Sequence, residues 1–174
     1  MSGWPYLAGT ISTKGRRSVR RGKEREMFEK FGEMGSWQEL NELAKNLMKE
    51  GDMESLQVFC KENGLDIEDI KDAAADGVEL FVTPTTAAAG RLKAEEESDG
   101  STPKCLYTMA RMIAADPHNA PMFVKKGKNV KGVFKKLEDI ARKNKSGSVG
   151  VACGTDRELA EIIMNYYQDK EAAK

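Results

Sequence analysis

Residues 36–51 read SWQELNELAKNLMKEG, and this stretch predicts a complete amphipathic helix with its own start and stop. Ser36 and Glu39 have the spacing of a capping box, in which each side chain bonds a backbone amide at the start of the helix. Leucine and alanine then recur at i, i+3, i+4 and i+7, so they share one helical face. Gly51 follows as the expected C-terminal stop.

Similar helix signals recur along the rest of the chain. Further helix starts are predicted at six capping residues, which are Asp52, Asp66, Thr83, Thr102, Asn129 and Thr155. Residues 78–82 are apolar enough for an extended segment or one short strand. No stretch alternates apolar and polar residues long enough to require a sheet. The sequence therefore predicts an all-α fold, a small multi-helix bundle.

Charge divides the chain into three parts. Residues 1–30 carry eight Lys or Arg against three Glu, residues 31–100 carry six against seventeen acidic groups, and residues 101–174 carry fourteen against eight. Such asymmetry indicates an acidic module followed by a basic one. We predict a basic segment at 1–33, an acidic helical module at 34–97, a linker at 98–102 and a second helical domain at 103–170.

The first 26 residues differ from the rest because they are basic and lack a hydrophobic period. Three interpretations remain open: an arm for phosphate backbones, a disordered tail, or a segment that is not translated. The third interpretation arises because residues 22–26 can be encoded by purine-rich codons. Such a stretch of the gene could be a ribosome-binding site instead of coding sequence. On that hypothesis the natural start is Met27 or Met34.

The sequence contains no motif for several classes of function. No apolar run is long enough to span a membrane, and Cys60, Cys105 and Cys153 suit a reducing cytoplasm better than a disulfide framework. His118 is the single histidine and has no nucleophile motif beside it, so a loop or capping role is expected. We predict no metal, no cofactor and no enzymatic activity.

Two surfaces remain as candidates for binding a partner. The first is a lysine- and arginine-rich stretch in 125–145; its candidate contact residues, with one from the last helix, are Lys128, Lys131, Lys135, Arg142, Lys143 and Tyr167. Its alternative is an ordinary solvated helix face. The second is the acidic module, which could imitate a nucleic-acid backbone; the alternative is that the carboxylates of its helices are ordinary solvated faces. If Tyr166 lies in the core, Tyr167 is expected on the rim, where tyrosine is enriched in contacts; the alternative is partial burial beside the bundle.

The C-terminal half also resembles a known family. The matching residues are Asp116-Pro117, residues 125–132 (KKGKNVKG), residues 141–143 (ARK), and Asp156 with Tyr166-Tyr167. Between Leu106 and Asp169 this pattern is similar to the PcfK-like family of mobile genetic elements, which includes anti-CRISPR inhibitors of Cas9-type nucleases. Residues 37–97 resemble an N-terminal module of related proteins from gut Firmicutes.

The resemblance implies a partner and a place of action. It implies stoichiometric inhibition of a Cas9-type nuclease inside a bacterial host cell, through either the acidic or the basic surface. The rival interpretation is a nucleic-acid-associated accessory protein of a conjugative plasmid or prophage, and a weaker one is a regulatory protein identified only by its partner. A salt series separates the first two, because phosphate contacts weaken steeply with salt.

Overall fold

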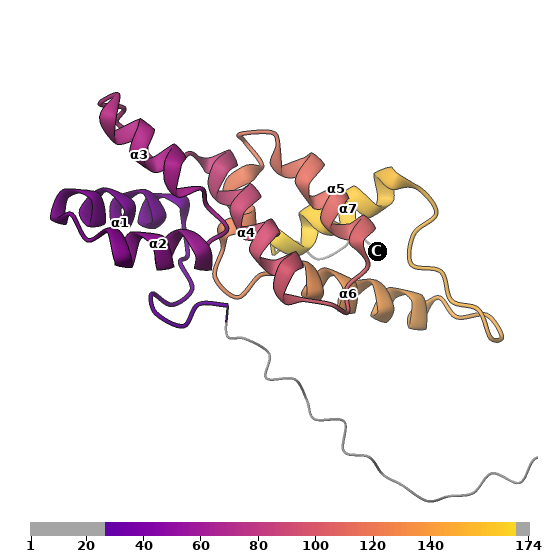
Figure 1. The fold of residues 1–174 in the computed structure, drawn as a ribbon. Coiled ribbons are helices and arrows are strands. Elements are labelled where there is room, and N and C mark those ends of the chain that lie inside the picture. The colour runs from indigo at the N-terminus through magenta and orange to yellow at the C-terminus, as the bar shows by residue number, and fades with distance from the viewer. Residues whose placement is uncertain (1–26, 170–174) are drawn as a thin grey trace, which may run out of the picture.

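The protein is all-helical, as predicted. The computed structural model describes residues 27–169 and contains, within that range, seven α-helices and one 3-10 helix (Figure 1). In chain order these are α1 (Trp37–Glu50), α2 (Met53–Glu62), α3 (Ile67–Ala75), α4 (Pro84–Ser98), α5 (Lys104–Ala114), η1 (Ala120–Val124), α6 (Val130–Lys143) and α7 (Asp156–Tyr167). The basic cluster predicted in residues 1–26 lies outside the described residues.

Most of the predicted helix starts are confirmed by side-chain caps. The side chains of Ser36, Asp52, Asp66, Thr83, Asn129 and Thr155 each accept a hydrogen bond from an amide of the following first turn. The cap at Thr102 is wrong, because α5 begins at Lys104 without a side-chain cap. The Thr102 hydroxyl instead donates to a carboxylate oxygen of Asp99.

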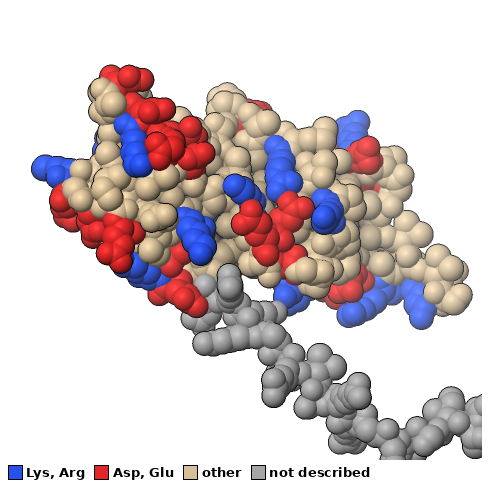
Figure 2. All heavy atoms as spheres, in the orientation of Figure 1, with Lys and Arg blue, Asp and Glu red and all other residues tan. Residues whose placement is uncertain are grey.

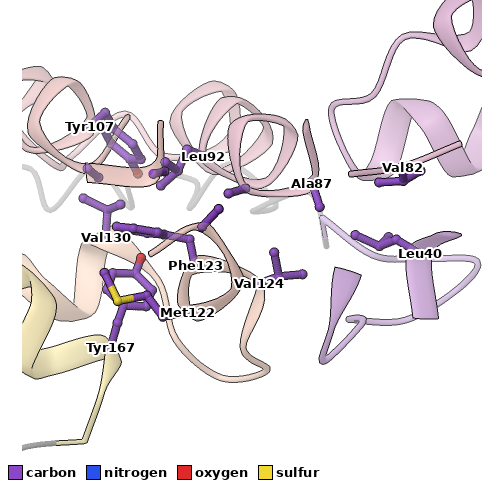
Figure 3. Packing of buried hydrophobic residues seen from close by; sticks show 14 of the residues in the cluster. Leu40, Val82, Ala87, Leu92, Tyr107, Met122, Phe123, Val124, Val130 and Tyr167 are labelled. Atoms are coloured by element: carbon purple, nitrogen blue, oxygen red, sulfur yellow. The ribbon is translucent and has the colours of Figure 1, made fainter. Parts of the chain in front are cut away.

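Helix α4 is the centre of the molecule. It makes its most extensive contacts with η1 and α5 and also packs against α1. Figure 3 shows Leu40 and Val82 near Ala87 at one end of this core, and Tyr107, Phe123 and Tyr167 towards the other. One buried apolar cluster therefore runs from α1 to α7 along α4.

Glycines let α4 approach the end of α2. A Cβ atom on Gly90 would lie 2.5 Å from the carbonyl oxygen of Asn63, and one on Gly64 would lie 2.2 Å from the carbonyl oxygen of Gly90. Gly64 also has a φ of 63°, a conformation that side chains with a Cβ rarely adopt. The two backbones touch here because neither glycine carries a side chain.

The apolar run 78–82 forms no strand within the described range. The Asn41 side chain takes the place of a strand partner, since its Oδ1 accepts hydrogen bonds from the amides of Phe81 at 2.8 Å and Val82 at 3.1 Å. Val82 is buried, whereas Val78 and Leu80 are exposed. The segment is thus an irregular connection with several bends, and it returns the chain from α3 to the core.

Two of the predicted domain boundaries fall where the structure is packed. Residues 27–33 were assigned to the N-terminal segment, yet Phe31 packs against the core and the amides of Lys30 and Phe31 donate to the Glu62 carboxylate. That boundary is therefore too late in the sequence. The linker at 98–102 is a tight turn, and α4 packs mainly on elements that follow it. Whether residues 34–97 fold alone stays a prediction.

Candidate nucleic-acid interface

The basic residues of the 125–145 stretch do not form one uniform surface. Asn129 starts α6, since its side chain accepts the Gly132 amide at 2.7 Å. From there Val130, Val133 and Leu137 turn inward and are buried. We define the α6 basic surface as the cations on the remaining face and just after the helix, which are Lys131, Lys135, Lys136, Arg142, Lys143 and Lys145. In Figure 2 lysine and arginine line the edge occupied by α6.

Within this surface the exposure of the predicted contact residues differs. Lys135 and Lys143 are exposed, and so is Arg142, which faces Asp139 across 3.6 Å in an ion pair one turn away. Lys131 is half-buried and takes part in an interaction of its own. An exposed ion pair contributes little, because solvent screens it. Lys135, Arg142 and Lys143 are therefore accessible to an anionic partner.

Lys128 has a structural role that the sequence did not suggest. Its ammonium donates to the carbonyl oxygen of Tyr166 at 2.9 Å and lies 4.6 Å from the centroid of the Tyr166 ring. Lys125 donates in the same way to the carbonyl oxygen of Tyr167 at 3.0 Å. Cations near the C-terminus of a helix bond its last carbonyls and oppose its dipole. These two lysines therefore hold the end of α7.

The expectation for the two tyrosines is reversed. Tyr167 is fully buried, with its ring 4.5 Å from that of Phe123, whereas Tyr166 is half-buried. The reason is that α7 turns Ile163 and Tyr167, spaced i and i+4, towards the core. Tyr166 lies over α6, where a Cβ on Gly132 would fall 1.9 Å from its hydroxyl. Tyr167 is thus not a contact residue.

A buried ion cluster positions the start of α6. Arg91 and Glu95 on α4 are each 4% exposed, and the Arg91 Nε donates to Glu95 Oε1 at 2.9 Å. The other Glu95 oxygen accepts the amide of Val130 at 3.0 Å, at the first turn of α6. Glu33 accepts a hydrogen bond from another nitrogen of the Arg91 guanidinium and accepts the Gly127 amide at 3.0 Å. The cluster therefore joins the N-terminal segment, α4 and the turn before α6.

Burial also shifts the ionisation of this region. Desolvation raises the pKa of Glu95, although the Val130 amide and the Arg91 guanidinium oppose the rise. Burial likewise raises the pKa of Tyr167, whose hydroxyl has no hydrogen-bond partner within the described residues. Desolvation acts to raise the pKa of Asp99, but hydrogen bonds from Thr102, Ser101 and Tyr107 outweigh it and hold that pKa well below its usual range.

A cleft of about 500 Å³ lies over this cluster, and Arg91, Glu95, Asp99 and Tyr107 are among its lining residues. Arg91 in this cleft already bonds Glu33 and Glu95, and both glutamates accept backbone amides. Asp99 accepts hydrogen bonds from the hydroxyls of Thr102 and Tyr107. Sequence reasoning treated the carboxylates of the acidic helices as solvated faces, which is wrong for Glu95. The one sequence signal was its i, i+4 spacing to Arg91, which is typical of an ion pair on a helix.

The opposite end of the molecule is acidic. Glu68, Asp69, Asp72 and Asp76 are exposed on and just after α3, and we call them the α3 acidic surface. Figure 2 shows acidic side chains gathered over α3. Lys71 pairs with Glu68 at 2.7 Å and neutralises part of it. The charge asymmetry of the sequence is therefore also a separation in space.

Residues 27–169 contain no cluster of His, Cys, Asp or Glu that could hold a metal ion. Within the same range, no helix is both long and apolar enough to cross a membrane. His118 is exposed in the turn after α5, where its amide donates to Asp116 at 2.9 Å.

Comparison with known proteins gives no further guide to function. The chain matches no family model, no curated protein and no solved structure.

Proposed function

We propose that this protein works by binding nucleic acid through the α6 basic surface. The observation that carries the proposal is the solvent exposure of Lys135, Lys136, Arg142 and Lys143 on one helix whose start is fixed by the buried Arg91–Glu95 pair. A rigid helix that presents several cations is suited to a phosphate backbone, which attracts cations without regard to sequence. Catalysis has no part in this proposal.

Two lysines that already hold the end of α7 are left out of the proposed contact. Lys125 and Lys128 each donate to a backbone carbonyl, so using them on phosphate would cost those bonds. The proposed contact therefore consists of the outward cations of α6. If about four of them reach phosphates, log K should fall with log salt at a slope of roughly −3.6.

The test is a duplex-binding titration with the full chain across a series of salt concentrations. The variant Lys135→Gln/Lys143→Gln should bind more weakly and with a slope smaller in magnitude by about 1.8, since each phosphate contact contributes roughly 0.9. The matched control is Lys49→Gln/Lys61→Gln, which removes two exposed lysines from α1 and α2. Equal slopes in both variants would refute a contact through α6.

A second candidate function is stoichiometric inhibition of a Cas9-type nuclease. It is supported by the resemblance to the PcfK-like family and by the α3 acidic surface, because such nucleases hold nucleic acid in positively charged channels. Titration of the protein into a guide-loaded nuclease should then abolish cleavage near a one-to-one ratio. Glu68→Gln/Asp72→Asn should weaken the inhibition, whereas Lys135→Gln/Lys143→Gln should not. Unimpaired cleavage at a large excess of the protein would eliminate this candidate.

A further inference from the structure

A short arm projects from the molecule between α6 and α7. The Ser146 amide donates to the Val149 carbonyl oxygen at 2.9 Å, and the Val149 amide donates back to the Ser146 carbonyl oxygen at 3.3 Å. Gly147 in the turn has a φ of 65°. These bonds close a tight turn over residues 146–149, and we call the loop 145–151 that contains it the 145–151 arm. Figure 1 shows it extending past the end of α6.

Two apolar side chains of the arm face solvent. Val149 is 64% exposed and Val151 is 56% exposed. Arg142 and Lys143 lie just before the arm and Lys145 is its first residue, and no acidic residue occurs between Asp139 and Asp156. A partner for this end of the molecule must therefore be anionic and must also offer apolar groups within reach of the cations.

The arm is held against the end of α6. The Asn144 amide group donates to the Val151 carbonyl oxygen at 3.2 Å. A Cβ on Gly150 would lie only 2.2 Å from the carbonyl oxygen of Ala141, so the arm backbone rests directly on the last turn of the helix. The backbone of the arm is consequently fixed relative to the last turn of α6, which carries Arg142 and Lys143.

We propose that the 145–151 arm enters the major groove of duplex DNA while the α6 basic surface holds the flanking phosphates; this inference rests on the proposed function. Two paired chains lie about 4.8 Å apart between backbones and are wider with their side chains. The minor groove, about 6 Å wide, is too narrow for them, whereas the major groove, about 12 Å wide, admits a two-stranded ribbon. The thymine methyl groups in that groove would supply the apolar contact.

The contribution of the valines differs in kind from that of the lysines. Valine releases no counterions, so replacing it should lower affinity without changing the dependence on salt. Replacing the lysines should change both. The valine contact should also require the thymine methyl group, which deoxyuridine lacks although it forms the same base pair.

The experiment compares two duplexes with the full-length protein, one rich in thymine and one with deoxyuridine in place of every thymine. The protein should bind the thymine duplex more tightly, and Val149→Ser/Val151→Ser should weaken that binding by roughly tenfold at an unchanged salt slope. The variant should also lose the preference for thymine. Val78→Ser, which alters an exposed valine after α3, is the control, and circular dichroism checks that each variant is folded.

Three results would overturn the inference. The arm contact would be refuted if neither Val149→Ser/Val151→Ser nor the replacement of thymine by deoxyuridine changed the affinity for the duplex. The α6 proposal would then still stand. Absence of any salt-sensitive duplex binding by the unaltered protein would refute both. Loss of binding to phosphatidylserine-containing vesicles in the valine variant, with duplex binding unchanged, would assign the arm to an anionic membrane instead.

Discussion

Replacing Glu95 with alanine tests the central packing and the position of the proposed interface together. The change removes a buried partner of Arg91 and leaves the Val130 amide without its acceptor. Breaking a buried ion pair typically costs about 3–5 kcal/mol, because one charge stays buried without compensation. Glu33 still bonds Arg91, so we expect the lower end of that range, about 3 kcal/mol.

The matched control is Glu96→Ala, the same substitution at the next residue of α4. Glu96 pairs with Arg111 near the surface, where both side chains reach solvent, and such pairs contribute less than about 1 kcal/mol. Thermal unfolding followed by circular dichroism measures both variants. Glu95→Ala should melt about 6–12 °C below the unaltered protein. Equal losses in the two variants would refute the buried-pair argument.

The same residue predicts the sign of a pH effect. Because burial raises the pKa of Glu95 above its ordinary 4.5, the folded chain binds a proton where the unfolded chain has lost it. The contribution of Glu95 to stability therefore falls as pH rises from about 4.5 through the raised pKa. Glu95→Gln should remove this fall, and its stability curve should be flatter over that range. A curve parallel to that of the unaltered protein would contradict the raised pKa.

Three further predictions concern other parts of the fold. Gly90→Ala should destabilise the protein by about 1–2 kcal/mol in urea unfolding, since the added Cβ meets the Asn63 carbonyl oxygen; a gain of about 1 kcal/mol, as helix propensity alone predicts, would contradict the close approach. Asp99→Asn should reduce the loss of stability below about pH 4, because hydrogen bonds lower the pKa of Asp99 in the folded state and its contribution disappears as acid protonates it; an unchanged acid limb of the stability curve would refute this. A chain that starts at Met34 should melt at a lower temperature than one that starts at Met27, because it lacks Phe31 and Glu33, and equal melting temperatures would show that residues 27–33 contribute nothing.

Sequence reasoning located the helices because their signals are local. A capping side chain such as that of Ser36 or Asn129 bonds an amide only three residues away, so both partners are visible in one short stretch. The same reasoning failed at Thr102, because α5 begins at Lys104 and places Pro103, which has no capping side chain, at its N-cap. It also failed at residues 27–33, because their contacts with Glu62 and Arg91 join distant parts of the chain.

The candidate interface was predicted only in part. The pattern of lysine and arginine in 125–145 predicted a basic face, and the exposure of Lys135, Arg142 and Lys143 is compatible with it. It did not predict that Lys128 would bond the last turn of α7, since that turn is far away in the sequence. Nor did it predict the 145–151 arm, because its small residues carry no helical period.

The sequence by itself determined the helical class and most of the helix boundaries, since these depend on residues within a few positions of one another. Tertiary structure alone decided that α4 is the centre, that Glu95 is buried and that Tyr167 faces inward in place of Tyr166. Adjacent helical residues point about 100° apart, and only the arrangement of neighbouring helices selects which of them is covered. In this protein the covered residue is Tyr167, because its ring packs against that of Phe123.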